Sequence, residues 1–328
     1  MLKIGQIGIG HNHGEAKMKA VRKFPELFQV IGFSEDNEEV FKKRGNFQAY
    51  QGLTRMTTDE LIDKCDVLLI ETEVPHLTKY AQKCVEKGKH IHLDKPGSMD
   101  TEEYKKMLDT AQKNNCIVQL GYMYRYNNGV KRAIELYKNG ALGEITMINA
   151  EMSTFHNVEY KKWLSTFKGG IMYILGSHLI DLAVYFLGEP KKITAFFKHS
   201  LLDGIDFADN NLAILEYDKA IARIFASSVE VNGWGRRQFF VSGTKGSIDI
   251  KPIENDIVVY EAFKDNCPNC YEDMKVKADI KDIPKDCRYD EMILDFYQYI
   301  MGTKENPFTY EHEYLVQKTI NEVIKGDK

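Results

Sequence analysis

The residues best suited to chemistry lie in a glycine-rich turn at residues 8–14. The turn consists of Gly8, Ile9, Gly10, His11, Asn12, His13 and Gly14. Between a strand and a helix, the first glycine permits the bend and the second lets a pyrophosphate approach the backbone, while the helix N-terminus offers N–H groups to the anion. The turn departs from Gly-x-Gly-x-x-Gly spacing, because His13 stands at the third position and Gly14 follows one residue late. We interpret it as a dinucleotide-binding turn.

A carboxylate after the second predicted strand supports this interpretation. Glu35 lies 21 residues past Gly14, where an acidic side chain can accept hydrogen bonds from the adenosine ribose hydroxyls. No arginine directly follows Glu35 to hold a 2′-phosphate, so NAD is favoured over NADP. The alternative is a structural glycine turn followed by a solvated acidic run over residues 35–39.

A second motif, Asp94-Lys95-Pro96, carries side chains suited to acid–base work. It lies where a predicted strand ends, at the edge where open α/β sheets bind ligands. A lysine in a partly dry cleft can have its pKa lowered enough for acid–base catalysis or can orient a hydroxyl. Taken alone, Lys95 is better explained as a surface lysine.

A third motif, Gly176-Ser177-His178, has Asp181 one helical turn later. We expect Ser177 to cap a helix over residues 177–187, which places His178 at the helix N-terminus. The cationic form of the imidazole is disfavoured there, so the ring would be neutral and able to accept a proton. A core or capping histidine explains the same residues equally well.

Two groups of elements must position these motifs. Over residues 1–121, strands alternate with helices, which predicts a doubly wound parallel sheet and an α/β fold. The expected strands are 3–9, 28–33, 67–70, 90–94 and 116–121, and the expected helices are 14–24, 75–87 and 101–114.

Residues 122–328 change to a pattern of neighbouring strands with short connections. This pattern predicts an α+β domain with a large, mostly antiparallel open sheet backed by helices. The C-terminal helices could pack back on the first domain. The expected strands are 144–153, 192–198, 211–217, 220–227, 237–242 and 247–250, and the expected helices are 130–139, 177–187, 289–301 and 310–325.

Composition excludes several classes of protein. The 328 residues carry a formal net charge of −4, which gives no basic footprint for nucleic acid. The longest apolar run, residues 182–187, is far shorter than the roughly 20 residues that span a bilayer. No secretory signal is expected at the N-terminus. The six cysteines are too sparse for a disulfide scaffold, so we expect a reducing compartment, the cytoplasm.

No metal site is expected. Cys267 and Cys270 form a lone Cys-x-x-Cys pair with Cys287 farther along, and a zinc site needs a fourth ligand. A surface-loop pair explains them better. The histidines at positions 11, 13, 76, 90 and 92 show no spacing to a carboxylate that completes a metal site.

The motifs together resemble the glucose–fructose oxidoreductase / inositol dehydrogenase / MocA (Gfo/Idh/MocA) family. The resemblance runs through IGQIGIGHNHG, DVLLIETEVPHLTKYAQKCVEKGKHIHLDKP, GYMYRYNNGVKRAIELYKNGALGEI, WLSTFKGGIMYILGSHLIDLAVYFLGEP and RRQFFVSGTKGSIDI. It implies an N-terminal Rossmann domain that binds NAD and a C-terminal domain whose open sheet often forms subunit contacts. The substrate would lie in the cleft between them, and a homodimer or homotetramer is expected.

The resemblance also implies roles for single residues. The turn from Gly8 to His13 would hold the pyrophosphate and Glu35 the adenosine ribose, while Thr72 and His76 would line the cofactor cleft. Asp94-Lys95-Pro96 matches the family's Glu-Lys-Pro element with a shorter acid, which places Asp94 among the cofactor-binding residues.

On the substrate side, the resemblance assigns Lys95 to the substrate hydroxyl. Arg125 matches an arginine at the start of the second domain, and His178 matches the proton acceptor of the polyol and sugar dehydrogenases. Those enzymes often carry an aspartate four residues before the histidine, where this chain has Ile174. Asp181 or another group would have to substitute for it.

Three functional hypotheses follow. The preferred one is an NAD-dependent oxidoreductase acting on the CH–OH group of a sugar, inositol or related polyol, with Lys95 and His178 as catalytic residues. Ile174 motivates an alternative, an NAD-binding sensor with weak or no redox activity. A third possibility is a reductase of a non-sugar carbonyl or imine, because Ile174 and several tyrosines could line a less polar pocket. The partner is a small molecule in each case, with no nucleic acid or membrane.

Overall fold

The computed structural model describes residues 1–266 and 271–327. Their contacts divide the chain into two compact units. Unit 1 comprises residues 1–123 and 284–317, and unit 2 comprises residues 124–283 and 318–328.

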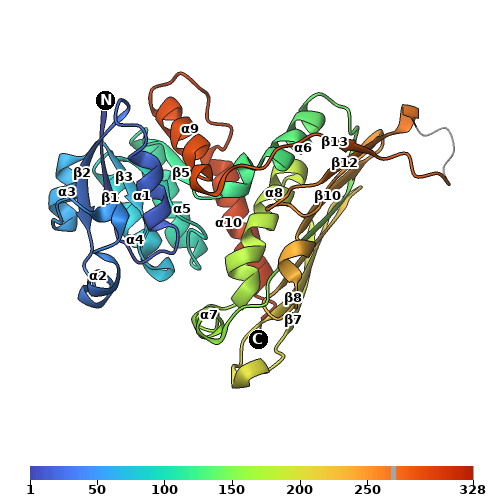
Figure 1. Cartoon of the computed structure of the whole chain (residues 1–328), viewed down its shortest axis with the longest axis horizontal. Coiled ribbons are helices and arrows are strands. Elements are labelled where there is room, and N and C mark those ends of the chain that lie inside the picture. The colour runs from blue at the N-terminus through green and yellow to red at the C-terminus, as the bar shows by residue number, and fades with distance from the viewer. Residues whose placement is uncertain (267–270, 328) are drawn as a thin grey trace. The chain divides into compact units, whose positions relative to one another are not determined.

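Unit 1 is built on a five-stranded parallel sheet (Figure 1). Its strand order is β2-β1-β3-β4-β5. The order reverses between β1 and β3, and ligands of open α/β sheets bind at such a point, outside the carboxyl ends of the strands. The strands are β1 (Leu2–Ile7), β2 (Phe28–Ser34), β3 (Val67–Ile70), β4 (His90–Leu93) and β5 (Val118–Leu120).

Helices pack against this sheet. The central strand β3 is apolar throughout, and its side chains must be covered on both faces to be kept from water. Every residue of β3 is buried, as expected for a parallel strand covered on both faces. α4 packs on β3 and β4, and α3 packs on β1 and β2. The helices are α1 (Gly14–Val21), α2 (Glu38–Arg44), α3 (Thr58–Lys64), α4 (Leu77–Glu86), α5 (Thr101–Lys113) and α9 (Asp290–Ile300).

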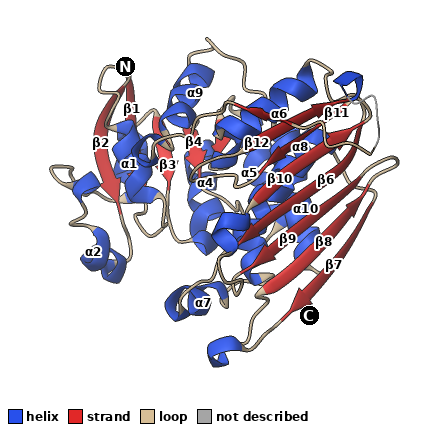
Figure 2. Ribbon diagram, turned by 45° about the vertical axis from the view of Figure 1, so that its right-hand side comes forward, coloured by secondary structure: helices blue, strands red, loops and turns tan. Residues whose placement is uncertain are grey.

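Unit 2 contains an eight-stranded sheet, in which long strands lie side by side (Figure 2). The order is β13-β12-β11-β10-β6-β9-β8-β7; β6 and β9 are parallel and the other neighbours antiparallel. The strands are β6 (Ile145–Ser153), β7 (Lys192–Lys198), β8 (Asn210–Glu216), β9 (Ile221–Ser227), β10 (Gln238–Gly243), β11 (Gly246–Ile250), β12 (Val259–Phe263) and β13 (Val276–Ala278).

Helices back one face of the large sheet (Figure 1). α8 packs on β6 and β9, and α6 packs on β11. The helices are α6 (Asn128–Lys138), α7 (Val158–Leu164) and α8 (Ser177–Leu187), and α10 (Tyr310–Ile324) runs from unit 1 into unit 2.

The expected fold class is confirmed: a parallel α/β sheet lies at the N-terminus and a large, mostly antiparallel sheet follows. The range of α8 agrees with the prediction, but the expected cap at Ser177 was wrong. A π-helical segment, Met172–Gly176, runs directly into α8, so Ser177 is inside a continuous helix and its hydroxyl donates to the Ile174 carbonyl. Cys267 and Cys270 lie outside the described residues. Among the residues described, no helix is both long and apolar enough to cross a bilayer.

A fully buried histidine links the sheet of unit 1 to α9. His92 on β4 donates through Nδ1 to Oε1 of Gln119 at 2.8 Å, and Nε2 of Gln119 donates to the Met292 carbonyl at 2.9 Å. Burial, reinforced by the charge of Lys17, lowers the pKa of His92 to about 3. The folded protein therefore holds this imidazole neutral at neutral and mildly acidic pH.

We expect His92 to make the protein sensitive to acid. Below pH 6.5 the unfolded chain protonates this histidine and the folded chain does not, so the free energy of unfolding falls with decreasing pH by about 1.4 kcal/mol per unit. The free energy of unfolding, measured with urea between pH 6 and 4.5, should therefore depend less steeply on pH in His92→Gln than in the wild type. The difference in slope should be about 1.4 kcal/mol per pH unit.

The matched control is His199→Gln. Hydrogen bonding to Asp206 raises the pKa of His199, so this residue is protonated in both states below about pH 6 and its loss should leave the slope unchanged. Equal slopes for wild type and His92→Gln would contradict the prediction.

Candidate functional site

A cavity of about 420 Å³ opens at the carboxyl ends of β1, β2 and β3 in unit 1. This volume lies within the range of small-molecule sites, and its position is the switch point of the sheet. The lining residues are Ile7, Gly8, Ser34, Glu35, Asp36, Asn37, Glu38, Thr58, Thr72, Glu73, His76 and Tyr80. Four predicted cofactor residues, Gly8, Glu35, Thr72 and His76, therefore line one cavity.

Glu35 connects the glycine turn to the end of β2. Its Oε2 accepts from the Ile9 N–H and its Oε1 from the Asn37 N–H, both at 2.9 Å. A carboxylate has about four acceptor positions, so each oxygen can still accept a ribose hydroxyl. The backbone contacts hold the carboxylate in place before a ligand arrives.

Two glycines of the turn are required by its geometry. Gly8 has φ +79°, and a Cβ there would lie 2.5 Å from the Cα of Thr72. Gly14 begins α1, and a Cβ there would lie 3.0 Å from Nε2 of Gln6 and 3.2 Å from Cβ of Glu71. Gly14 thus allows the close packing of helix on strand that the third glycine of the usual motif provides.

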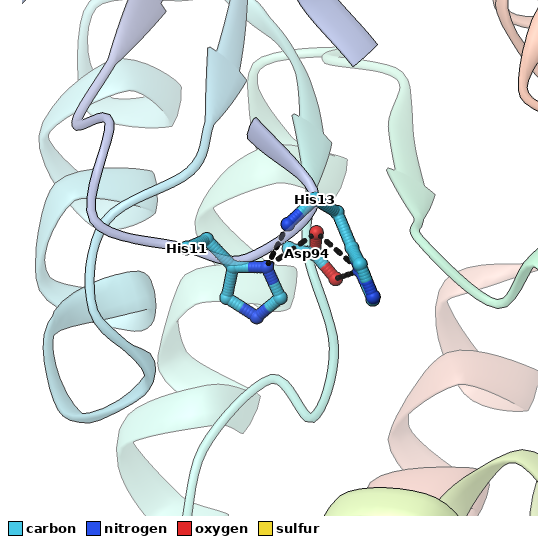
Figure 3. A group of neighbouring side chains, drawn as sticks. All are labelled: His11, His13 and Asp94. Carbon is cyan, nitrogen blue, oxygen red and sulfur yellow. Dashed lines mark hydrogen bonds and ion pairs between the residues drawn. The ribbon is translucent and has the colours of Figure 1, made fainter. Parts of the chain in front are cut away.

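His11 and His13 do not line this cavity but face Asp94, the residue that follows β4 (Figure 3). Nδ1 of His11 lies 2.9 Å and Nδ1 of His13 lies 3.1 Å from Oδ2 of Asp94. The other carboxylate oxygen, Oδ1, accepts from the backbone N–H of Lys95 at 2.7 Å. Asp94 thus connects the glycine turn to the Lys95 backbone.

A fully buried lysine completes this cluster. Nζ of Lys17, on α1, donates to Oδ2 of Asp94 at 2.5 Å and to Oε1 of Glu71 at 2.9 Å. All three side chains have 0% exposure. Sequence reasoning missed both Lys17 and Glu71. The position of Glu71 directly after the apolar strand β3 was a weak signal, but nothing in the sequence indicated its partner Lys17.

The cluster shifts the pKa values of its members. Burial alone would raise the pKa of Asp94, but His11 and Lys17 outweigh it and hold the pKa well below its usual range. Burial, with Asp94 beside it, raises the pKa of Glu71. Burial lowers the pKa of His11, and that of His13 to about 4. At neutral pH both imidazoles are therefore neutral beside an ionised Asp94.

Two neutral imidazoles and a carboxylate could in principle hold a metal ion, and their ligand atoms lie within 4.8 Å of one another. The sequence showed no such spacing, because the fold rather than the chain brings Asp94 to the two histidines. The Lys17 ammonium already contacts the Asp94 oxygen that would be the ligand. A divalent ion there would be opposed by on the order of several kcal/mol, so the chemistry favours an ion-paired cluster.

Other predicted residues take different positions. Arg44 donates to Oδ1 of Asn12 at 3.1 Å and to the His11 carbonyl at 2.9 Å, which supports the outside of the glycine turn. Lys95 is only 3% exposed, so the surface-lysine interpretation was wrong. Its peptide bond to Pro96 is cis.

In unit 2, His178 is 3% exposed and is the second residue of α8. The preceding π-helical segment contradicts the expected helix N-terminus at this position, so the argument that the terminus keeps the imidazole neutral does not apply. π-Helical segments occur often at functional sites, and this one contains Ile174 and directly precedes His178.

Asp181 and Arg125 bind each other. Nε of Arg125 lies 3.0 Å from Oδ2 of Asp181, and Nη2 lies 2.5 Å from Oδ1. Both side chains are buried, and such a paired arrangement is strong and geometrically specific. The carboxylate of Asp181 is therefore held by the guanidinium of Arg125.

The fold and the cavity together define a class of protein. A parallel sheet of order 2-1-3-4-5 carries a glycine turn after β1 and an acidic residue after β2, and the cavity lies at its switch point. These are the features of a Rossmann-type dinucleotide-binding protein.

Comparison with known families identifies the group. Residues 2–122 match the oxidoreductase family with an NAD-binding Rossmann fold, and residues 130–249 match the GFO/IDH/MocA C-terminal domain. The chain belongs to the Gfo/Idh/MocA family of NAD(P)-binding oxidoreductases.

Individual relatives are distant. The chain is 30% identical over 201 residues to glucose-6-phosphate 3-dehydrogenase of Bacillus subtilis, covering 59% of this chain and 56% of that protein. It is 24% identical over 269 residues to myo-inositol 2-dehydrogenase of Thermotoga maritima, covering 79% and 78%. The match covers 61%, 70% and 56% of the lengths of three curated relatives.

Solved structures share the fold at low identity. The structure of a levoglucosan dehydrogenase in complex with NADH and L-sorbose superposes with a TM-score of 0.83 at 19% identity, covering 100% of this chain and 97% of that chain.

The close approach at Gly8 predicts a loss of cofactor binding in Gly8→Ala. An alanine there would meet the Thr72 backbone and displace the turn that is predicted to bind the pyrophosphate, so we expect NAD affinity to fall at least about tenfold, or 1.4 kcal/mol. Isothermal titration with NAD measures the change.

Gly52→Ala is the matched control. Gly52 has a similar φ, +76°, but its added Cβ meets nothing within 4 Å, so the variant has the same backbone strain of about 1–2 kcal/mol without the contact. Equal NAD affinity in the two variants would refute the steric explanation.

Proposed function

We propose that this protein is an NAD-dependent oxidoreductase acting on a CH–OH carbon of a sugar, inositol or related polyol. The observation that carries the proposal is the acidic cavity at the switch point of the parallel sheet, lined by Gly8 and Glu35. Residues 1–121 would act as the NAD-binding domain, and residues 122–328 would supply the substrate face and the subunit contacts.

In the proposed reaction, the substrate CH–OH becomes C=O. NAD⁺, which Gly8 and Glu35 would help to hold, would supply the hydride acceptor. Lys95 orients and polarises the hydroxyl oxygen, and His178 accepts the hydroxyl proton. Asp94 supports Lys95 through its backbone N–H, and Arg125 and Asp181 help to form the substrate side as a pair. General acid–base help of this kind contributes about 10²–10⁴-fold.

The charges around the cavity favour NAD over NADP. Glu35, Asp36 and Glu38 all line it, and carboxylates oppose a 2′-phosphate. Arg55 lies close by but donates to the Glu35 carbonyl, pairs with Glu38 and stacks on Phe41 with its guanidinium 3.9 Å from the ring centroid.

The substrate class is supported by composition and by relatives. A net charge of −4 provides no general attraction for anionic ligands. The relatives that match this chain include dehydrogenases of glucose 6-phosphate and myo-inositol.

Ile174 supports two alternatives. It is 4% exposed, and an aliphatic side chain cannot stabilise an imidazolium as the usual aspartate does. An NAD-binding sensor with little redox activity would tolerate this change. So would a reductase of a non-sugar carbonyl or imine, whose pocket would be less polar.

The uncovered face of the large sheet supports a homodimer or homotetramer. Its outward residues include a row of neighbours across three strands, Phe196, Leu212 and Phe225, and Phe196 is 51% exposed. A closed symmetric pair would cover such a face. We also keep the cytoplasm as the expected location, because Cys65, Cys84 and Cys116 are free and buried.

The proposal predicts NAD reduction with a neutral polyol and dependence on His178. A panel containing myo-inositol, scyllo-inositol, glucose 6-phosphate and levoglucosan, followed by nicotinamide absorbance, should show turnover that falls about 10²–10⁴-fold in His178→Ala. His199→Ala is the control. Full turnover in His178→Ala would remove its assigned role, and NAD binding without any absorbance change would favour the sensor.

The charge argument predicts that Asp36 limits NADP binding. Its carboxylate accepts from the Tyr80 hydroxyl at 2.7 Å and is thereby held at the cavity wall. Removing one negative charge near a phosphate is worth about 1–4 kcal/mol, so Asp36→Ser should bind NADP at least about tenfold more tightly. Asp109→Ser, on α5, is the control. Fluorescence titration with NADPH measures the affinity, and an unchanged value in Asp36→Ser would contradict the prediction.

A further inference from the structure

We propose that Tyr124 is a positioning residue that holds the imidazole of His178 in place through a ring contact. The inference rests on the proposed role of His178 as proton acceptor. It concerns how unit 2 orients that histidine when residue 174 offers no carboxylate.

The contact is a close edge-to-face pair. The ring centroids of Tyr124 and His178 lie 4.9 Å apart with an interplanar angle of 79°. The two side chains are 2% and 3% exposed. Buried aromatic pairs of this geometry contribute about 0.5–1.5 kcal/mol beyond their area, which is enough to favour one imidazole orientation about two- to tenfold.

The phenol ring is itself fixed by its hydroxyl. The Tyr124 hydroxyl donates to Oε1 of Glu254 and accepts from Nη1 of Arg237 at 3.3 Å. Nη1 of Arg237 also donates to the same Glu254 oxygen at 2.6 Å. The three groups form a closed triangle, so the phenol ring cannot move away from this position without breaking two hydrogen bonds to charged partners, which are among the stronger hydrogen bonds in proteins.

The triangle is in turn anchored to the large sheet. Nε of Arg237 donates to the carbonyl of Ser153, the last residue of β6, and Nη2 donates to the Thr154 hydroxyl at 2.5 Å. The guanidinium lies 3.8 Å from the Trp234 ring centroid. Arg237 therefore connects the Tyr124 hydroxyl to the end of β6, and the Tyr124 ring in turn contacts His178.

Two further residues of unit 2 close to His178 in the sequence are Ile174 and Asp181. Ile174 has no charged group, and Asp181 is engaged by both Nε and Nη2 of Arg125. An aromatic contact fixes the direction of an imidazole without adding the negative charge that would raise its basicity. A misplacement of about 1 Å in a catalytic group can reduce a rate by roughly 10²-fold. The orientation of the His178 imidazole can therefore affect the rate by itself.

The experiment reads the His178 imidazole directly. The full-length protein is labelled with ¹³C at histidine Cε1, and the His178 resonance is assigned from the spectrum of His178→Gln. The variants are Tyr124→Leu, which removes the ring, and Tyr124→Phe, which keeps it. Tyr137→Leu is the matched control, because Tyr137 forms a similar edge-to-face pair with Phe186 at 5.2 Å elsewhere in unit 2.

We expect Tyr124→Leu to move the His178 resonance toward its position in an unfolded peptide, and Tyr124→Phe and Tyr137→Leu to leave it in place. With a substrate from the panel, kcat should fall about two- to tenfold in Tyr124→Leu with little change in KM, and Tyr124→Phe should restore most of it. An unmoved resonance in Tyr124→Leu, or an equal shift in Tyr137→Leu, would overturn the proposal.

Glu254→Gln tests the anchoring if Tyr124→Leu does not fold. It keeps the ring but removes the charged partner of the hydroxyl, so the resonance should move in the same direction by a smaller amount. An unmoved resonance would refute the proposed anchoring. Because the spectra need no substrate, this outcome is independent of whether His178→Ala retains turnover.

Discussion

The ammonium group of Lys17 is the interaction on which the site in unit 1 depends. It lies at 0% exposure between Glu71 and Asp94, so α1, the end of β3 and the end of β4 all meet at one charge. Burying an ion is expensive, and removing one partner of such a group leaves another charge without compensation, which costs about 3–5 kcal/mol. The cluster therefore fixes the relative position of these three elements at the edge of the sheet where ligands bind.

That constraint divides the glycine turn into two parts with different tasks. Ile9 faces the Glu35 carboxylate and the acidic cavity, whereas His11 and His13 face Asp94. Since His11 and Lys17 hold the pKa of Asp94 well below its usual range, Asp94 retains its charge and can hold the Lys95 backbone. The shorter side chain of Asp94 fits this arrangement, because Lys17, His11 and His13 all contact its carboxylate.

Much of the scaffold was predictable because its signals are local. The strand β7 was expected and found over residues 192–198, and the glycine turn lies between a strand and a helix as its spacing implied. Helix α2 was missed because its seven residues contain none that is buried, so it lacks an apolar period. Lys17 and Glu71 are 54 positions apart, and nothing in a single sequence reveals such a pair. The π-helical segment before α8 likewise left no pattern, and it moved His178 from an expected helix end into a helix interior.

The same limitation applies to the surroundings of His178, where the sequence shows only that Ile174 replaces an aspartate. From the motif alone, the loss of an aspartate leaves a histidine without a charged neighbour. In the fold, Tyr124 lies against that histidine, and its hydroxyl is held by Glu254 and Arg237, residues more than one hundred positions farther along the chain. Residues this far apart in the sequence come together only through the fold, so no motif could have indicated this contact.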